Sequence, residues 1–298
     1  MTLHITNVSK RYGKAVQALQ DVSLTVQPGM FGLLGPNGAG KSTLMRIIAT
    51  LQEADAGSIT LDGIDVLRQP RQVRAILGYL PQEFGLYPKV TARALLDHLA
   101  LLKGVGPRAR RREQVDALLR RTNLWEVRNR KLGSFSGGMK QRFGVAQALL
   151  GDPRLIIVDE PTAGLDPEER IRFYNLLSEI GENVIVVLST HIVEDISQLC
   201  QQMAIIDAGR VLLAGDPLTT MEALRGRVYR KIVDRPEGPA YREGYAVLAT
   251  KLFAGRIVVR VLADAAPGAG FTAAEPTLED VYFATIRYGF RGTAPTGD

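Results

Sequence analysis

Cysteine and histidine are scarce in this chain, and their scarcity excludes several kinds of site. Cys200 is the single cysteine among 298 residues, so no internal disulfide can form. We interpret it as a small buried apolar residue, not a nucleophile. The only histidines are His4, His98 and His191, too few to build a metal cluster with one cysteine. The composition therefore excludes a disulfide-stabilised secreted fold and a structural zinc module.

Long apolar runs are also missing. Each apolar stretch is interrupted well before the roughly eighteen residues that a membrane-spanning helix needs. Residues 1–16 lack the apolar segment and cleavage site of a secretory signal, so we expect the protein to stay in the cytosol. No internal repeat is visible. The length suits one full domain and a smaller one.

Positive charge exceeds negative charge, with a formal net charge of +6. This balance permits nucleic acid or an anionic membrane surface as a partner without choosing between them. Much of the excess lies between residues 103 and 131, where only Glu113, Asp116 and Glu126 oppose a run of basic residues. A solvated helical face is the favoured interpretation of that run.

A glycine-rich segment between two apolar stretches is the most informative motif. Residues 35–43 read GPNGAGKST, preceded by an apolar run typical of a strand and followed by one with helical spacing. Glycines in such a turn let backbone amides approach a polyphosphate, and the following helix presents free N–H groups. The motif predicts a nucleoside triphosphate site formed by Gly35, Pro36, Asn37, Gly38, Ala39, Gly40, Lys41, Ser42 and Thr43. Lys41 would reach the β- and γ-phosphates, and Ser42 would bind Mg²⁺.

Further polar residues follow predicted strands, where ligands bind in open α/β sheets. Asp159 and Glu160 end the apolar run LIIV; the first would bind Mg²⁺ with Ser42, and the second would orient or deprotonate an attacking water. His191 follows NVIVVLST and would hydrogen-bond a γ-phosphate or that water. Gln82 follows ILGYL and would bridge metal-bound water and a moving segment. Judged alone, Gln82 fits an ordinary surface residue and His191 a structural one.

A second anion-binding element is predicted at residues 135–142, which read FSGGMKQR. Ser136, Gly137 and Gly138 open a predicted helix, so their amides would face an anion. One ATP does not need both elements from one subunit.

The remaining pattern predicts an α/β domain over residues 1–220, with a helical subdomain at about 85–148. A small α+β accessory domain is expected over 221–290, followed by a disordered tail at 291–298. We predict strands at 4–8, 22–26, 59–61 and 76–80, buried parallel strands in LIIVDE and NVIVVLST, a hairpin across Ala208-Gly209, a strand pair at 245–252 and 256–262, and a helix with Leu278, Val281, Tyr282 and Thr285 on one face.

In their order along the chain, these motifs resemble those of the ATP-binding cassette (ABC) family through nearly all of residues 3–231. GPNGAGKST resembles Walker A, LIIVDE resembles Walker B, and FSGGMKQR resembles the signature. Gln82 resembles the Q-loop glutamine, and the segment Ala163 to Asp166 resembles the D-loop. His191 resembles the switch histidine, and Tyr12 resembles the A-loop aromatic that stacks on adenine. A core tyrosine is the alternative for Tyr12. The signature has Phe135 and Met139 where the family commonly has leucine and glutamine. Ser136, Gly137 and Gly138 are intact, so nucleotide binding is expected to survive.

The resemblance implies a P-loop NTPase fold with a mixed sheet, the helical insertion and the accessory domain. SGGMKQR with DPEER and the C-terminal TLEDVY resembles ATPase subunits of ABC-2 type exporters, some linked to drug or antibiotic resistance. Such a subunit would hydrolyse ATP with Mg²⁺, pair head to tail with a second ATPase subunit, a homodimer being the simplest case, and energise a separately encoded membrane permease. It would be cytoplasmic and peripheral on the inner face of the membrane, with no nucleic acid expected.

Two alternatives stay open from the residues. One is a soluble ABC ATPase acting on nucleic acid or ribosomes, although such members typically carry two cassettes or a long coiled-coil insertion, and neither is visible here. The other is a regulatory binding module without hydrolysis, which the intact Asp159, Glu160 and His191 oppose.

Overall fold

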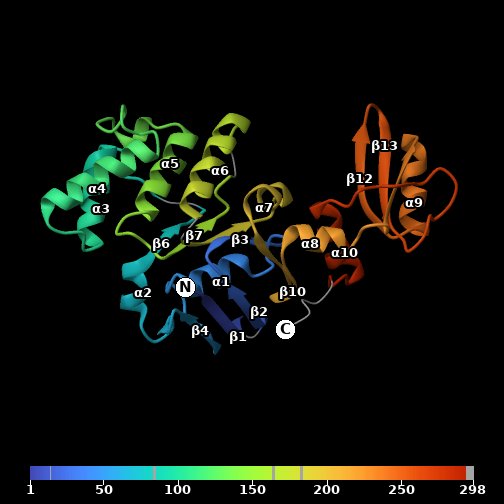
Figure 1. Cartoon of the computed structure of the whole chain (residues 1–298), viewed down its shortest axis with the longest axis horizontal. Coiled ribbons are helices and arrows are strands. Elements are labelled where there is room, and N and C mark those ends of the chain that lie inside the picture. The colour runs from blue at the N-terminus through green and yellow to red at the C-terminus, as the bar shows by residue number, and fades with distance from the viewer. Residues whose placement is uncertain (14, 83–84, 163–164, 182–183, 293–298) are drawn as a thin grey trace.

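The computed structural model describes residues 1–13, 15–82, 85–162, 165–181 and 184–292. The described strands form three sheets (Figure 1). The first is antiparallel, in the order β2-β1-β4-β5, and consists of β1 (Leu3–Tyr12), β2 (Val16–Val26), β4 (Ala56–Leu61) and β5 (Ile64–Asp65). The strands predicted at 4–8, 22–26 and 59–61 are confirmed within these longer ones.

The central sheet has the strand order β10-β9-β3-β8-β7-β6. Its strands are β3 (Gly29–Leu34), β6 (Leu77–Leu80), β7 (Leu155–Asp159), β8 (Ile185–Thr190), β9 (Gln202–Asp207) and β10 (Arg210–Gly215). All neighbours pair in parallel except β9 and β10, which form the predicted hairpin, so the sheet is mixed as expected. Strands β7 and β8 are buried at every position, which explains their continuous apolar sequence.

Helices cover this sheet and extend from it. Around the sheet lie α1 (Lys41–Ile48), α2 (Pro70–Ile76), α6 (Pro167–Gly181), α7 (Val193–Leu199) and α8 (Pro217–Glu222). The predicted helical insertion contains α3 (Ala92–Leu102), α4 (Arg108–Arg121), the short 3₁₀ turn η1 (Leu132–Ser134) and α5 (Gly137–Ala148). The strand predicted from Ile76 begins at Leu77 instead, because Ile76 completes α2.

The C-terminal part forms a separate four-stranded sheet in the order β12-β13-β11-β14 (Figure 1). Its elements are β11 (Val228–Val233), η2 (Arg235–Glu237), α9 (Gly238–Gly244), β12 (Val247–Phe253), β13 (Arg256–Leu262), β14 (Thr272–Ala273) and α10 (Leu278–Tyr288). A small core of Val233, Val247, Val259 and Val261 lies on one face of this sheet. The predicted pair β12 and β13 and the predicted final helix are present.

Helix α10 returns to the N-terminal part of the chain, where it packs against α7 and α8, and it also contacts β12. Its buried residues Leu278, Val281 and Ala284 join the main hydrophobic core. The division of the chain near residue 221 stays a prediction, since this helix contacts both parts. Of the predicted disordered tail, only Arg291 and Gly292 lie within the described residues.

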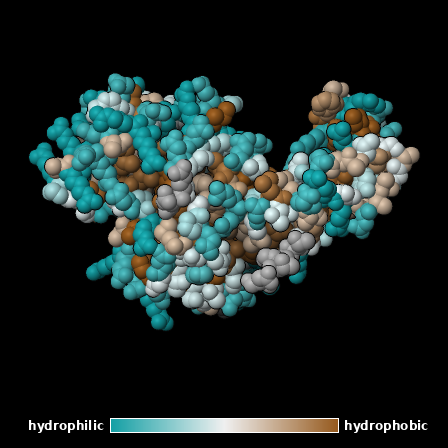
Figure 2. All heavy atoms as spheres, viewed as in Figure 1, coloured by the Kyte–Doolittle hydropathy of each residue, from teal (hydrophilic) through white to brown (hydrophobic). Residues whose placement is uncertain are grey.

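The surface is largely hydrophilic over the helical insertion (Figure 2), where most basic side chains of residues 103–131 are exposed. Two exposed apolar side chains, Leu252 and Phe253, lie at the far end of the β12–β13 hairpin. Among the described residues, no helix is both long enough and apolar enough to cross a bilayer.

Candidate functional site

The glycine-rich loop joins the end of β3 to the start of α1, as its sequence predicts. Gly38 and Gly40 have φ angles of 82° and 105°. Residues other than glycine adopt such angles only at a cost in free energy. A Cβ on Gly40 would lie 2.5 Å from the carbonyl oxygen of Ala18, whereas one on Gly38 would meet nothing within 4 Å. The loop is therefore packed tightly on one side and open at Gly38, which leaves room for a phosphate.

Lys41 is a buried cation at the mouth of this loop. Its side chain is only 5% exposed, and Nζ donates to the carbonyl oxygens of Gly35 and Pro36 at 2.7 and 3.1 Å. Nζ also lies 3.8 Å from Oε1 of Glu160. Burial lowers the pKa of Lys41, while Glu160 and Asp159 oppose that shift. Further negative charge beside Nζ would stabilise the ammonium, which fits a polyphosphate ligand.

Glu160 and His191 are adjacent although 31 positions separate them. Glu160 follows β7 with a φ of 50°, and its N–H donates to the carbonyl oxygen of Ser189 at 2.9 Å. Its Oε2 lies 2.5 Å from Nδ1 of His191, which follows β8. A positive φ at a non-glycine residue is a strained conformation, found often at functional sites. The carboxylate is nearly buried while the imidazole is 47% exposed, so a ligand can reach the pair from the histidine side.

Asp159 supplies an acceptor that has no partner within the described part of the chain. Its Oδ1 is buried without a hydrogen bond, and so is Oγ of the neighbouring Ser189. No group of three or more potential metal ligands occurs among the described residues. Mg²⁺ commonly binds through one or two protein oxygens together with substrate phosphates, so the acceptor Asp159 and the hydroxyl of Ser42 fit that mode.

Tyr12 lies beside the loop and not in the core. Its ring is 43% exposed, its hydroxyl donates to Oε1 of Gln52 at 2.8 Å, and the same hydroxyl is 3.4 Å from Oγ1 of Thr43. The alternative of a core tyrosine is therefore wrong. Contact of Tyr12 with adenine stays a prediction.

The signature segment lies in the helical insertion. Ser136 caps α5, its Oγ accepting from the N–H of Met139 at 3.2 Å, and Gly137 is exposed. Gly138 is buried against Glu169. Phe135 is 5% exposed and belongs to the main core, so the unusual aromatic is a packing residue.

Two further predicted motifs are only partly located. Gln82 is exposed just after β6, and no hydrogen bond joins it to the residues around Lys41 within the described ranges. Ala163 and Gly164 of the D-loop lie outside the described residues. Asp166, the last residue of that segment, accepts a hydrogen bond from the N–H of Glu169 at 2.8 Å and so caps α6.

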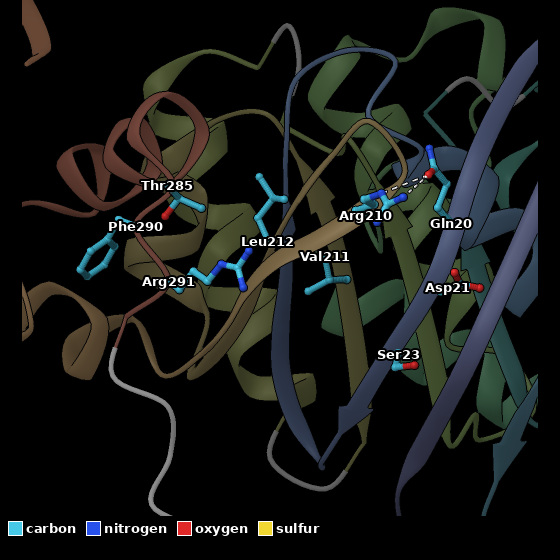
Figure 3. Close-up of a pocket in the computed structure, with 10 residues that line it drawn as sticks. Gln20, Asp21, Ser23, Arg210, Val211, Leu212, Thr285, Phe290 and Arg291 are labelled. Carbon is cyan, nitrogen blue, oxygen red and sulfur yellow. Dashed lines mark hydrogen bonds between the residues drawn. The ribbon is translucent and has the colours of Figure 1, made fainter.

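The turn of the β9–β10 hairpin braces the glycine-rich loop from the side. The N–H of Gly209 donates to the carbonyl oxygen of Ala39 at 3.0 Å, and its own carbonyl accepts from the N–H of Gln20 at 2.8 Å. Next to this turn, Arg210 donates to the side chain of Gln20 (Figure 3). These two residues form one end of a cleft of about 470 Å³ that reaches Thr285 in α10 and Arg291, which follows that helix.

The structure also reveals a buried carboxylate outside the motifs predicted from the sequence, Asp195 on α7. It accepts hydrogen bonds from Thr162 and Thr190. A signal was available, because Asp195 precedes the buried apolar residues Ile196 and Leu199 on the same helical face. An acidic residue on an apolar face needs buried partners.

Comparison with known proteins places these features in a family. The model of the family described as ABC transporter matches residues 19–163. The ABC transporter ATP-binding protein NatA of Bacillus subtilis is 38% identical over 217 residues, which are 71% of this chain and 88% of that protein. The Nod factor export ATP-binding protein I of Rhizobium etli is 39% identical over 228 residues, 75% of this chain and 71% of that protein.

A solved structure supports the same assignment. The dimeric post-hydrolysis structure of the ATP-binding cassette MJ0796 bound to ADP and Pi has a TM-score of 0.65 and 27% identity, covering 72% of this chain and 98% of that one. The P-loop NTPase fold expected from sequence is therefore confirmed. The chain belongs to the ABC transporter family, as an ATP-binding, ATP-hydrolysing subunit of the kind found in exporters.

Proposed function

We propose that this ATPase subunit drives export through a separately encoded membrane permease, at two ATP sites shared by two head-to-tail subunits. The observation that carries the proposal is the contact of Glu160 with both His191 and Lys41 beneath a loop that is open at Gly38. A carboxylate that is held between two basic groups and next to a phosphate site is suited to hydrolysis.

Each residue of the site has a role in this proposal. Lys41 binds the β- and γ-phosphates, and Ser42 with Asp159 holds Mg²⁺, which neutralises phosphate charge when bound. Glu160 accepts a proton from the attacking water, with Oε2 directed by Nδ1 of His191.

Other residues would bind the nucleotide without taking part in proton transfer. Tyr12, beside Thr43, stacks on adenine. Gln82, exposed after β6, hydrogen-bonds metal-bound water near the γ-phosphate and so links the site to a moving segment.

The second subunit would complete the site with its signature segment. Ser136 caps α5, and the exposed backbone of Gly137 leaves the amides at this helix end accessible to a γ-phosphate from outside the subunit. The dimeric arrangement of the related cassette MJ0796 supports this part of the proposal. Identical copies give two equivalent sites, so the simplest assembly is a homodimer.

The proposed location is the inner face of the cell membrane, where the permease would hold the subunit. The rival function, action on nucleic acid or ribosomes, rests on the net charge of +6 alone. Much of the basic surface lies on the helical insertion, away from the loop that contains Lys41.

Purified protein tests the proposal directly. We expect Mg²⁺-dependent ATPase activity that rises more steeply than linearly with protein concentration, because two subunits form each site. The Glu160→Gln variant should lack this activity, and the chain should co-purify with a polytopic membrane protein encoded beside it. Retention of the chain on nucleic acid in place of the membrane, in a salt-sensitive manner, would favour the rival function.

A further inference from the structure

Asp195 is a fully buried carboxylate whose two oxygens are both used. Oδ2 accepts from the hydroxyls of Thr162 and Thr190 at 2.7 and 2.8 Å. Oδ1 accepts from the guanidinium of Arg170 and the hydroxyl of Tyr174, both on α6. Asp195 itself is 0% exposed. Burying a carboxylate is costly unless it is paired and hydrogen-bonded, and this one is satisfied on both sides.

The Oδ2 side joins the two loops that carry the hydrolytic pair. Thr162 lies two positions after Glu160, and Thr190 immediately precedes His191. The hydroxyl of Thr190 also accepts a hydrogen bond from the N–H of Ile192 at 2.9 Å. The residues on either side of His191, Thr190 and Ile192, are therefore both held by hydrogen bonds of the Thr190 hydroxyl. One carboxylate oxygen thus ties the segment after β7 to the end of β8, next to His191.

The partners of Oδ1 lie on helix α6 and balance the negative charge of Asp195. Arg170 neutralises the carboxylate, and its Nε donates to the hydroxyl of Tyr174 at 2.6 Å. Burial, together with the hydrogen bond to Asp195, raises the pKa of Tyr174, so the phenol stays protonated and remains a donor. Among the described residues, the side chains of Arg170 and Tyr174 hydrogen-bond only to each other and to Asp195. The two oxygens can therefore be tested separately.

We propose that Asp195 is a positioning residue for ATP hydrolysis, holding His191 against Glu160 through Thr190 and Thr162. The inference rests on the proposed hydrolytic role of Glu160. The contact being positioned is the 2.5 Å approach of Nδ1 to Oε2, which a small displacement of either loop would break. Misplacement of a catalytic group by about 1 Å can reduce the rate by about a hundredfold.

Matched variants distinguish positioning from general stability. Thr190→Val removes the hydroxyl and keeps the side-chain shape, Thr190→Ser keeps the hydroxyl, and Tyr174→Phe removes a donor only from the Oδ1 side. We expect Thr190→Val to lower kcat by about tenfold to a hundredfold while the Kd for ATP changes by less than about threefold. Thr190→Ser should restore most of kcat. Tyr174→Phe should lower Tm and leave kcat within about twofold of the wild type.

The outcomes separate this inference from the proposed function. Two results would overturn the positioning role if Glu160→Gln is inactive. One is a wild-type kcat in Thr190→Val, and the other is a loss of kcat in Tyr174→Phe as large as that in Thr190→Val. Wild-type activity in Glu160→Gln would instead remove the hydrolytic role on which the inference depends. Asp195→Asn should reproduce the kcat loss of Thr190→Val with a lower Tm. If that variant does not fold, the three conservative variants still decide the question.

Discussion

Nδ1 of His191 lies 2.5 Å from Oε2 of Glu160, which joins the ends of two neighbouring parallel strands through their side chains. The other oxygen of the same carboxylate lies 3.8 Å from Nζ of Lys41. Glu160 is thus held between a histidine and a lysine. A phosphate that binds Lys41 would change the charge around Glu160, so nucleotide binding and the position of the carboxylate are linked.

The first prediction concerns the carboxylate itself. Glu160→Gln keeps the shape of the side chain and removes its capacity to accept a proton. We expect ATP turnover to fall by at least about a hundredfold. ATP binding should persist because Lys41 and the loop are unchanged. A stable ATP-bound dimer in light scattering, together with the absence of phosphate release, is the expected result, and normal turnover would contradict the role of Glu160.

The second prediction tests whether Glu160 and His191 act as a unit. His191→Ala removes the partner of Oε2 and should lower kcat without a large change in the Kd for ATP. If the two residues act together, the double variant Glu160→Gln/His191→Ala should be little slower than Glu160→Gln alone. Single-turnover assays of the four proteins measure this coupling. Multiplicative losses in the double variant would show that the residues act independently.

The third prediction uses two adjacent glycines of the signature segment as a matched pair. A Cβ on Gly138 would lie 2.5 Å from Oε2 of Glu169, the acceptor of a salt bridge from Arg142, whereas one on Gly137 would meet nothing within 4 Å. Gly138→Ala should therefore lower Tm in the isolated subunit. Gly137→Ala should leave Tm nearly unchanged and weaken ATP-dependent dimerisation, because the added methyl group blocks the exposed helix end.

Thermal unfolding and size-exclusion chromatography with ATP measure these two effects. A lower Tm in Gly137→Ala, or unaffected dimerisation, would argue against contact between this segment and a second subunit. The comparison is informative because both substitutions add the same group to consecutive residues of one helix.

Much of the nucleotide site could be predicted because its chemistry is local. The tight turn before Lys41 and the buried strands that end at Asp159 and Thr190 each have a short sequence signal. The order of the strands then brings these segments together, since β7 and β8 are parallel neighbours and β8 also pairs with β3.

The hydrogen bonds around Asp195 could not be predicted in the same way. Thr162, Arg170 and Asp195 come from three segments, and their meeting depends on how α6 and α7 pack. The return of α10 to the ATPase part was missed for a similar reason. Its apolar face was visible in the sequence, but an apolar face does not identify the surface that it covers.

The last prediction follows from the burial of Lys41, which lowers its pKa from the ordinary value of 10.5 in the nucleotide-free protein. Bound phosphates favour the charged ammonium and would raise that pKa again, so ATP binding takes up a proton at high pH. As the pH rises through the lowered pKa of Lys41, the ammonium is lost before ATP binds, so the apparent Kd for ATP increases by at most about tenfold per pH unit. Titration calorimetry between neutral pH and about pH 10 should show this slope in the wild type. Lys41→Arg should remove it, because the guanidinium stays charged throughout that range. An equal slope in both proteins would assign the pH dependence to another group.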